Sequence, residues 1–328
     1  MQSQNESVPG SKKLLATVAL LGAVVAISGV SIFYRISEND ISATAAAFNR
    51  FWITFVILAT SLTVKSIYKP RNLVSEIRQN LNLHDQAVQW ALLASLSMGL
   101  TQIFWAKALV HSSVAIATVL HNTIPIFIAL IACLFLRETF TNYYWISLGI
   151  SLIGIIVLGS RDIQLTTLSL QGDTYAILSA ICAALCILAS EKAKQRMSVP
   201  WILLWMSLIG TILITYILVV QQTFFFPNSI EGWAGVISLA IICQIIGNGL
   251  LIFSLQYFSS GFVSICLLMD PISAGLTARG LFHERLSLNE WVVFSLIFSS
   301  ITVCVLGSFF PNSTQEPSEY SLGSKLRT

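Results

Sequence analysis

Long apolar runs alternate with short polar segments along most of the chain. Ten windows of 17–23 residues hold almost no charge, and with flanking residues each can cross a hydrocarbon core of about 30 Å as a helix. Membrane-spanning strands need alternating apolar and polar positions instead, and runs such as 153–158 do not alternate. The pattern predicts an all-α integral membrane protein with ten transmembrane helices. The windows are residues 14–34, 43–64, 87–106, 114–136, 143–159, 174–190, 201–220, 233–254, 261–282 and 291–310.

The amino-acid composition also indicates a protein embedded in a lipid bilayer. Of the 328 residues, 55% are hydrophobic and only 10% are charged, whereas a soluble domain has about 25% charged residues. Inside the windows the only charged side chains are Arg50, Asp270 and Arg279. The polar ends, residues 1–13 and 311–328, are predicted to be disordered tails.

The positions of the cations predict the orientation. Ten spans place both termini on one side, and the segments on that side hold twelve Lys and Arg residues against five on the other. By the positive-inside rule that side is cytoplasmic. We expect a multi-pass protein of the plasma (inner) membrane with both termini in the cytoplasm.

Other classes of protein lack support in the sequence. The net charge of +3 is small and dispersed, so no nucleic-acid partner is expected. All six cysteines lie in apolar windows and are interpreted as free thiols, neither disulfides nor metal ligands. There is no phosphate-binding loop and no hydrolase or metalloprotease motif. We therefore expect no catalytic residues, metal or cofactor, and the expected partners are a small-molecule substrate and the bilayer. Monomer and homodimer both remain open.

An internal repeat gives the strongest signal of mechanism. At an offset of 146 residues, Pro125 matches Pro271, Glu138 matches Glu284, and Trp145 matches Trp291. The repeat divides the chain into five-helix units at 14–165 and 166–310. Because five is odd, the second unit should be inverted in the membrane relative to the first. Inverted repeats are the geometric basis of alternating access, which favours a transporter.

Three further pieces complete a family pattern. Phe48-Asn49-Arg50-Phe51 lies in the second span, Gly172-Asp173 precedes the sixth, and Leu158-Gly159 and Leu306-Gly307 close the two repeats. With the repeated Pro and Glu, the chain resembles EamA-type members of the drug/metabolite transporter superfamily over about residues 14–310. The resemblance implies a ten-helix carrier of metabolites or drugs, commonly an exporter, with cytoplasmic termini. Span seven, however, has no arginine equivalent to Arg50.

Two charged residues inside spans are the main site candidates. Arg50 should face the bundle interior, because a guanidinium near the bilayer centre costs about 2.5–3.5 kcal/mol. It could bind an anionic group, pair within the bundle or reach the interface. Asp270 precedes Pro271 in mid-span, where it could bind a proton or cation or act as a counter-ion of Arg50 or Arg279.

Further polar and aromatic residues inside spans are candidates for a substrate cavity, although interhelical hydrogen bonding or packing would explain them equally well. These residues are Asn49, Gln102, Trp105, His121, Asn122, Trp205, Gln244 and Asn248.

The repeated residues have separate expected roles. Pro125 and Pro271 are predicted kinks or hinges. Glu138 and Glu284 are expected at helix ends, as structural groups or as gates.

The leading hypothesis is a secondary transporter of a small organic metabolite or drug that works by alternating access, as an exporter, with proton or ion coupling left open. The alternatives are a membrane-embedded channel, a receptor and a lipid-modifying enzyme.

Overall fold

The computed structural model describes residues 10–68, 77–112, 114–159, 170–270, 272–273 and 288–309, and within them it contains helices and turns but no strand. In chain order the helices are α1 (Gly10–Glu38), α2 (Ala43–Tyr68), α4 (Gln86–His111), α5 (Val114–His121), α6 (Ile124–Ile131), η1 (Ala132–Leu136), α7 (Asn142–Gly159), α8 (Leu170–Lys194), α9 (Val199–Gln221), α10 (Ile230–Ser238), η2 (Leu239–Asn248), α11 (Gly249–Ser254), α12 (Ser260–Leu267) and α14 (Leu288–Phe309).

Seven of these helices or helix runs are long and apolar enough to cross a membrane, and two shorter apolar helices cover Asn142–Val157 and Trp291–Leu306. An all-helical, multi-pass membrane protein is therefore confirmed. In the ninth predicted window the described residues include α12 and a turn after it, so the count of ten spans stays a prediction. α1 begins at Gly10, four residues before the first predicted window.

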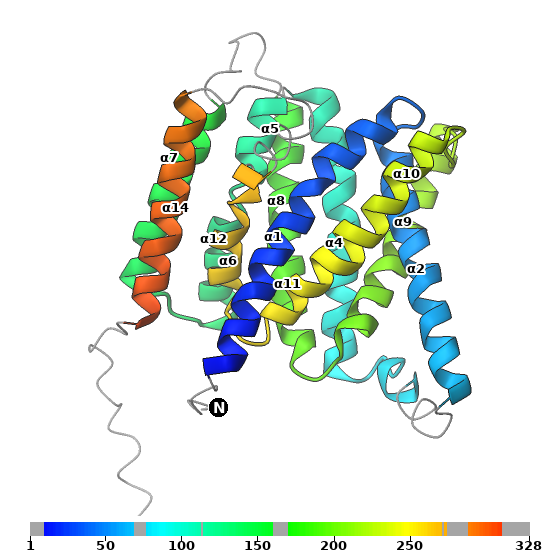
Figure 1. Cartoon of the computed structure of the whole chain (residues 1–328), viewed down its shortest axis with the longest axis horizontal. Coiled ribbons are helices and arrows are strands. Elements are labelled where there is room, and N and C mark those ends of the chain that lie inside the picture. Colours follow the sequence, from blue (N-terminus) through cyan, green and yellow to red (C-terminus); the bar gives the residue numbers. More distant parts are fainter. Residues whose placement is uncertain are drawn as a thin grey trace, which may run out of the picture.

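Corresponding helices of the two halves make corresponding contacts. α1 packs along α10, η2 and α11, just as α4 packs along α8, while α2 pairs with α9 and α7 with α14. Figure 1 shows that α1 runs away from the end of the bundle marked N and that α2 returns to it. In the second half the directions are reversed, because α8 runs toward that end and α9 runs away from it. The α7–α14 pair stands at one edge.

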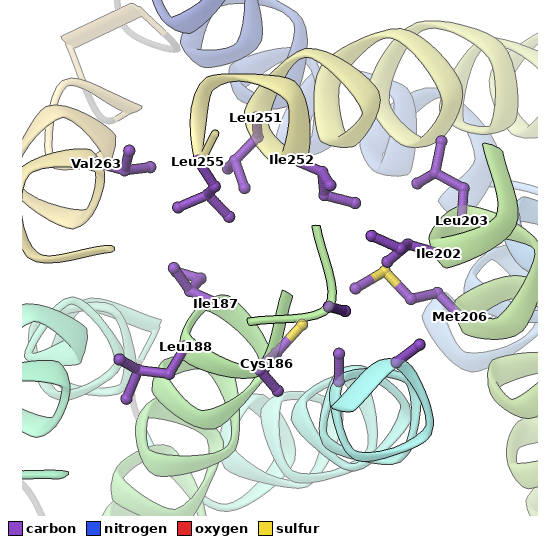
Figure 2. Close-up of a cluster of buried hydrophobic side chains, with 14 of the residues drawn as sticks. Cys186, Ile187, Leu188, Ile202, Leu203, Met206, Leu251, Ile252, Leu255 and Val263 are labelled. Atoms are coloured by element: carbon purple, nitrogen blue, oxygen red, sulfur yellow. The ribbon is translucent and has the colours of Figure 1, made fainter. Parts of the chain in front are cut away.

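The largest buried cluster joins α4, α8, α9, α11 and α12, and Figure 2 shows its centre. Ile202, Leu203 and Met206 of α9 face Cys186 and Ile187 of α8 there. Buried alanines along α4 and α8 let these two helices approach closely. Within a bilayer the hydrophobic effect does not drive helices together, so close van der Waals packing stabilises their association instead.

α2 and α9 are aligned by their N-termini. Ser42 precedes α2 and Ser198 precedes α9, and each accepts the first backbone hydrogen bonds of its helix. The seventh residue of each helix donates to a loop of the other half: Asn49 Nδ2 to Phe225 O over 2.6 Å, and Trp205 Nε1 to Asn80 O over 3.2 Å. The offset is thus 156 residues here, and it falls to 146 after the shorter second loop.

Two helices are interrupted at equivalent positions. α5 ends at His121, residues 122–123 form a turn, and α6 begins before Pro125; α12 ends at Leu267, residues 268–269 form a turn, and Asp270 is helical again. In each turn the second backbone N–H donates to the carbonyl three residues earlier, from Thr123 and from Met269. The repeat therefore extends to the place where the helix breaks.

Candidate functional site

Arg50, Gln244 and Asn248 form a buried, hydrogen-bonded chain between α2 and η2. Arg50 is 3% exposed, and its Nε donates to Gln244 Oε1 over 2.8 Å. Asn248 Nδ2 donates to the same oxygen over 3.1 Å and to Cys243 O over 3.2 Å. Three of the predicted residues, from both halves of the chain, therefore meet at one point.

Asp270 belongs to the same region. The Cys243 thiol lies within electrostatic reach of both Arg50 and Asp270, and the Tyr34 hydroxyl lies beside the Arg50 guanidinium. Within the described residues, Asp270 Oδ1 and Gln244 Nε2 are buried and have no hydrogen-bond partner. Because such groups cost about 1–3 kcal/mol each, two of them in the region of a buried arginine indicate a place where a ligand or proton completes the bonding.

The helix that supplies Gln244 is a π-helix. η2 covers Leu239–Asn248, and Gln244 within it accepts the hydrogen bond from Arg50 of α2. π-Helical segments are rare and occur often at functional sites. Thr54 Oγ1 bridges the same two helices, donating to Arg50 O over 2.7 Å and lying 3.3 Å from Ala240 O.

A second polar group surrounds the break between α5 and α6. The Nδ1 atom of His121 lies 3.0 Å from Ser179 Oγ, which in turn lies 3.1 Å from Thr101 O. The Trp105 ring packs on the imidazole with ring centroids 4.7 Å apart. Two predicted residues thus come together in the first half of the chain, with α8 supplying the serine.

The other predicted polar residues lie apart from these groups. The Asn49 amide donates to Ala45 O and Phe225 O and accepts from Trp52 Nε1, so its hydrogen-bonding groups are used in fixing the α9–α10 loop. Trp205 binds the loop before α4. Gln102 and Asn122 are half-buried.

The repeated proline and glutamate have clear partners where they are described. Pro125 is buried, and its carbonyl accepts from the Tyr144 hydroxyl of α7 over 2.9 Å. Glu138 forms an ion pair of 2.8 Å with Lys192 at the end of α8. Pro271 and Glu284 lie outside the described residues.

One residue not singled out in the sequence ties the halves together at the opposite end. Asp40, between α1 and α2, accepts from the backbone N–H groups of Asn228 and Ser229 over 2.7 and 2.8 Å and from Ser229 Oγ over 3.0 Å. These bonds, first of all the one from the Ser229 N–H, hold the pKa of the Asp40 carboxyl below its usual value.

A separate cavity of about 280 Å³ lies between the end of α8 and the turn before α12. Glu191 and Lys194 line it, but Glu191 Oε2 already accepts from Ser260 N and Lys194 Nζ donates to Gln256 Oε1. Both charges are thus used in joining the turn to α8, and the cavity contains none of the predicted site residues.

Comparison with known proteins decides the family. The model of the EamA-like transporter family matches the chain twice, over residues 14–160 and 170–306. The chain belongs to the EamA-like transporter family. This EamA protein is therefore a membrane transporter of the drug/metabolite type, built from two sequence repeats that include Arg50 in the first match and Gln244 and Asp270 in the second.

The fold is also found among solved structures. One crystal structure aligns with this EamA protein over 90% of the chain and 98% of its own length, with a TM-score of 0.75 and 15% sequence identity. At that identity the likeness concerns the fold alone. The comparison with curated proteins finds no match.

The residues that the sequence does not indicate are interaction partners of distant residues, and their residue types alone do not suggest a binding site. Tyr34, Ser179 and Asp40 each act on a residue more than ten positions away, and nothing in their local sequence marks them. A signal did exist for α2 and α9, because allowing the offset to change in the loops aligns Ser42 with Ser198.

Proposed function

We propose that this EamA protein is a secondary transporter that moves a small organic metabolite across the plasma (inner) membrane by alternating access, with export as its direction and both termini in the cytoplasm. Arg50 and Gln244 bind the substrate between the two halves, and Asp270 binds the proton or cation to which transport is coupled.

The observation that supports this most is the pair of helix breaks. Discontinuous helices at equivalent positions of two repeats are typical of carriers, in which the freed backbone groups and the change of direction permit two conformations. Here one break adjoins His121 and the other adjoins Asp270, and the second lies in the region of the buried Arg50. The opposite running of α1 and α8 fits the same mechanism.

Transport by purified protein tests the proposal. A thermal-stabilisation screen over amino acids, nucleosides, sugars and organic anions selects a substrate, whose flux is then measured in proteoliposomes. We expect saturable flux that an opposing gradient of unlabelled substrate accelerates. Flux that rises linearly with concentration at very high rates would instead identify a channel.

The role of Arg50 needs a matched variant. Arg50→Ala should abolish saturable flux while leaving expression near the wild-type level, because Gln244 Oε1 keeps its hydrogen bond from Asn248. Arg78→Ala is the control, since it removes the same side chain from an exposed position outside the spans. Flux retained in Arg50→Ala would reject the proposed substrate contact.

A further inference from the structure

We propose that the substrate is an amphipathic organic anion, a carboxylate on an apolar body. Its carboxylate binds Arg50 and Gln244, and its apolar body binds the half-buried Met98. This inference rests on the proposed function and names the substrate class of the same site.

The free hydrogen-bonding groups favour an anion. Gln244 is fully buried, its Oε1 already accepts from Arg50 and Asn248, and its Nε2 has no partner within the described residues. A carboxylate could therefore accept from Gln244 Nε2 while it interacts with the guanidinium. Arg binds carboxylates well because its planar fork presents several N–H groups.

A cationic substrate would find fewer hydrogen-bond acceptors at this site. The Gln244 oxygen already accepts hydrogen bonds, and among the described residues the unpartnered carboxylate acceptor of this region is a single oxygen of Asp270. A cation bound there would also experience the charge of Arg50, because the Cys243 thiol lies within electrostatic reach of both Arg50 and Asp270. An ammonium group without a second acceptor would stay poorly hydrogen-bonded in a buried site, which costs free energy.

The apolar end follows from comparing the two halves. With the offset of 156 residues in α2 and α9, the equivalent of Arg50 is Met206; with the offset of 146 in the next span, the equivalent of Gln244 is Met98. At each of these two matched positions, one half thus has a charged or amide side chain and the other half has a thioether. Methionine side chains adapt to apolar ligands of different shape.

Packing places Met98 between two buried clusters. Met98 packs against the cluster that contains Phe51 and Cys243, and it also packs against the cluster that contains Met206. Met98 therefore lies between the cluster that contains Phe51, the neighbour of Arg50 in the sequence, and the cluster that contains Met206. A molecule with its carboxylate at Arg50 would extend its apolar part along this direction, where α2, α4 and α9 meet.

Binding to the purified, full-length protein tests the class. The probes are hexanoate, butanoate and acetate, with hexanamide and hexylamine as neutral and cationic matches of the longest acid, and the readout is the dissociation constant. We expect binding of hexanoate but not of its amide or amine. Affinity should rise about fourfold for each buried methylene group from acetate to hexanoate.

Two variants divide the site. Arg50→Gln should weaken hexanoate binding at least tenfold. Met98→Ala should reduce the gain from acetate to hexanoate by about tenfold, while Met98→Leu restores it. Because Met98 is only half-buried, its variants are expected to fold, and circular dichroism and size-exclusion chromatography are the checks on their folding.

The outcomes separate this inference from the proposed function. Equal binding of hexylamine or hexanamide, absence of hexanoate binding, or affinity independent of chain length would overturn the anion inference. Saturable flux of a sugar or a cation by the same preparation would still support a carrier. Linear flux of every compound in the screen would overturn the carrier itself.

Discussion

At the scale of single residues, Gln244 provides a neutral hydrogen-bond acceptor for the buried guanidinium of Arg50. Gln244→Leu removes the acceptor of Arg50 Nε, and a lost hydrogen bond to a charged group costs about 1.5–3 kcal/mol, so the variant should unfold at lower temperature. Gln244→Glu should keep or raise the melting temperature, because it pairs with the guanidinium, but it should abolish flux by occupying the place of an anion. Thermal unfolding and proteoliposome flux measure both. Full activity of Gln244→Glu would contradict the substrate role of Arg50.

Asp40 gives a prediction on pH, since its carboxyl lies outside the spans. Its pKa is lower in the folded protein than in the unfolded chain, so its stabilisation is complete above the unfolded pKa of about 3.9 and is lost as pH falls through the lower, folded value. Asp40→Asn should therefore lower the melting temperature at pH 7, and the difference from wild type should shrink as the pH falls below about 3.9. The control is Glu231→Gln, an exposed carboxylate in the first turn of α10. A difference that persists at low pH would show that charge is not the cause.

At the scale of elements, the hydrophobic windows predict where the described helices lie, but they do not predict the breaks and π-helical turns inside them. Span four was expected as one run, 114–136, with a kink at Pro125; the structure divides it into α5, α6 and η1. The break involves Thr123 Oγ1, which donates to Leu120 O, and Tyr144 from another helix. Hydropathy cannot register either bond. The π-helix η2 likewise has no marker in the sequence, although its polar residues Gln244 and Asn248 were identified.

The α5–α6 break should be needed for transport rather than for stability. Pro125 lies in the first turn of α6. In a helix that continued from α5 into α6 it would become an interior residue, where proline is about 3 kcal/mol less favourable than Ala, so Pro125→Ala lets the two helices join. We expect an unchanged or higher melting temperature together with a strongly reduced transport rate. Pro200→Ala is the matched control, because Pro200 also lies in the first turn of its helix, α9, but follows a turn and not another helix of the same span. Normal flux in Pro125→Ala would show that the break is not a hinge.

At the scale of the whole molecule, the sequence predicted the duplication but not how the halves hold each other. Asn49 donates to the loop of the second half, and Trp205, its equivalent, donates to the loop of the first. The sequence makes both candidates for a cavity, because each is polar or aromatic within a span. Their partners are backbone carbonyls more than a hundred positions away, which composition and periodicity do not identify. The same two bonds, one from each half, join the ends of the bundle symmetrically.

Opposite orientation of the halves makes a prediction that needs no substrate. Val110, near the end of α4, and Gln256, just after α11, are equivalent at the offset of 146 residues, and both are exposed. If the halves are inverted and the termini cytoplasmic, a membrane-impermeant maleimide should label Val110→Cys in intact cells and Gln256→Cys only after the membrane is opened. The wild-type protein gives the background, since five of its six cysteines are buried. Labelling of both variants from the same side would contradict the inversion, and with it the two-fold basis of alternating access.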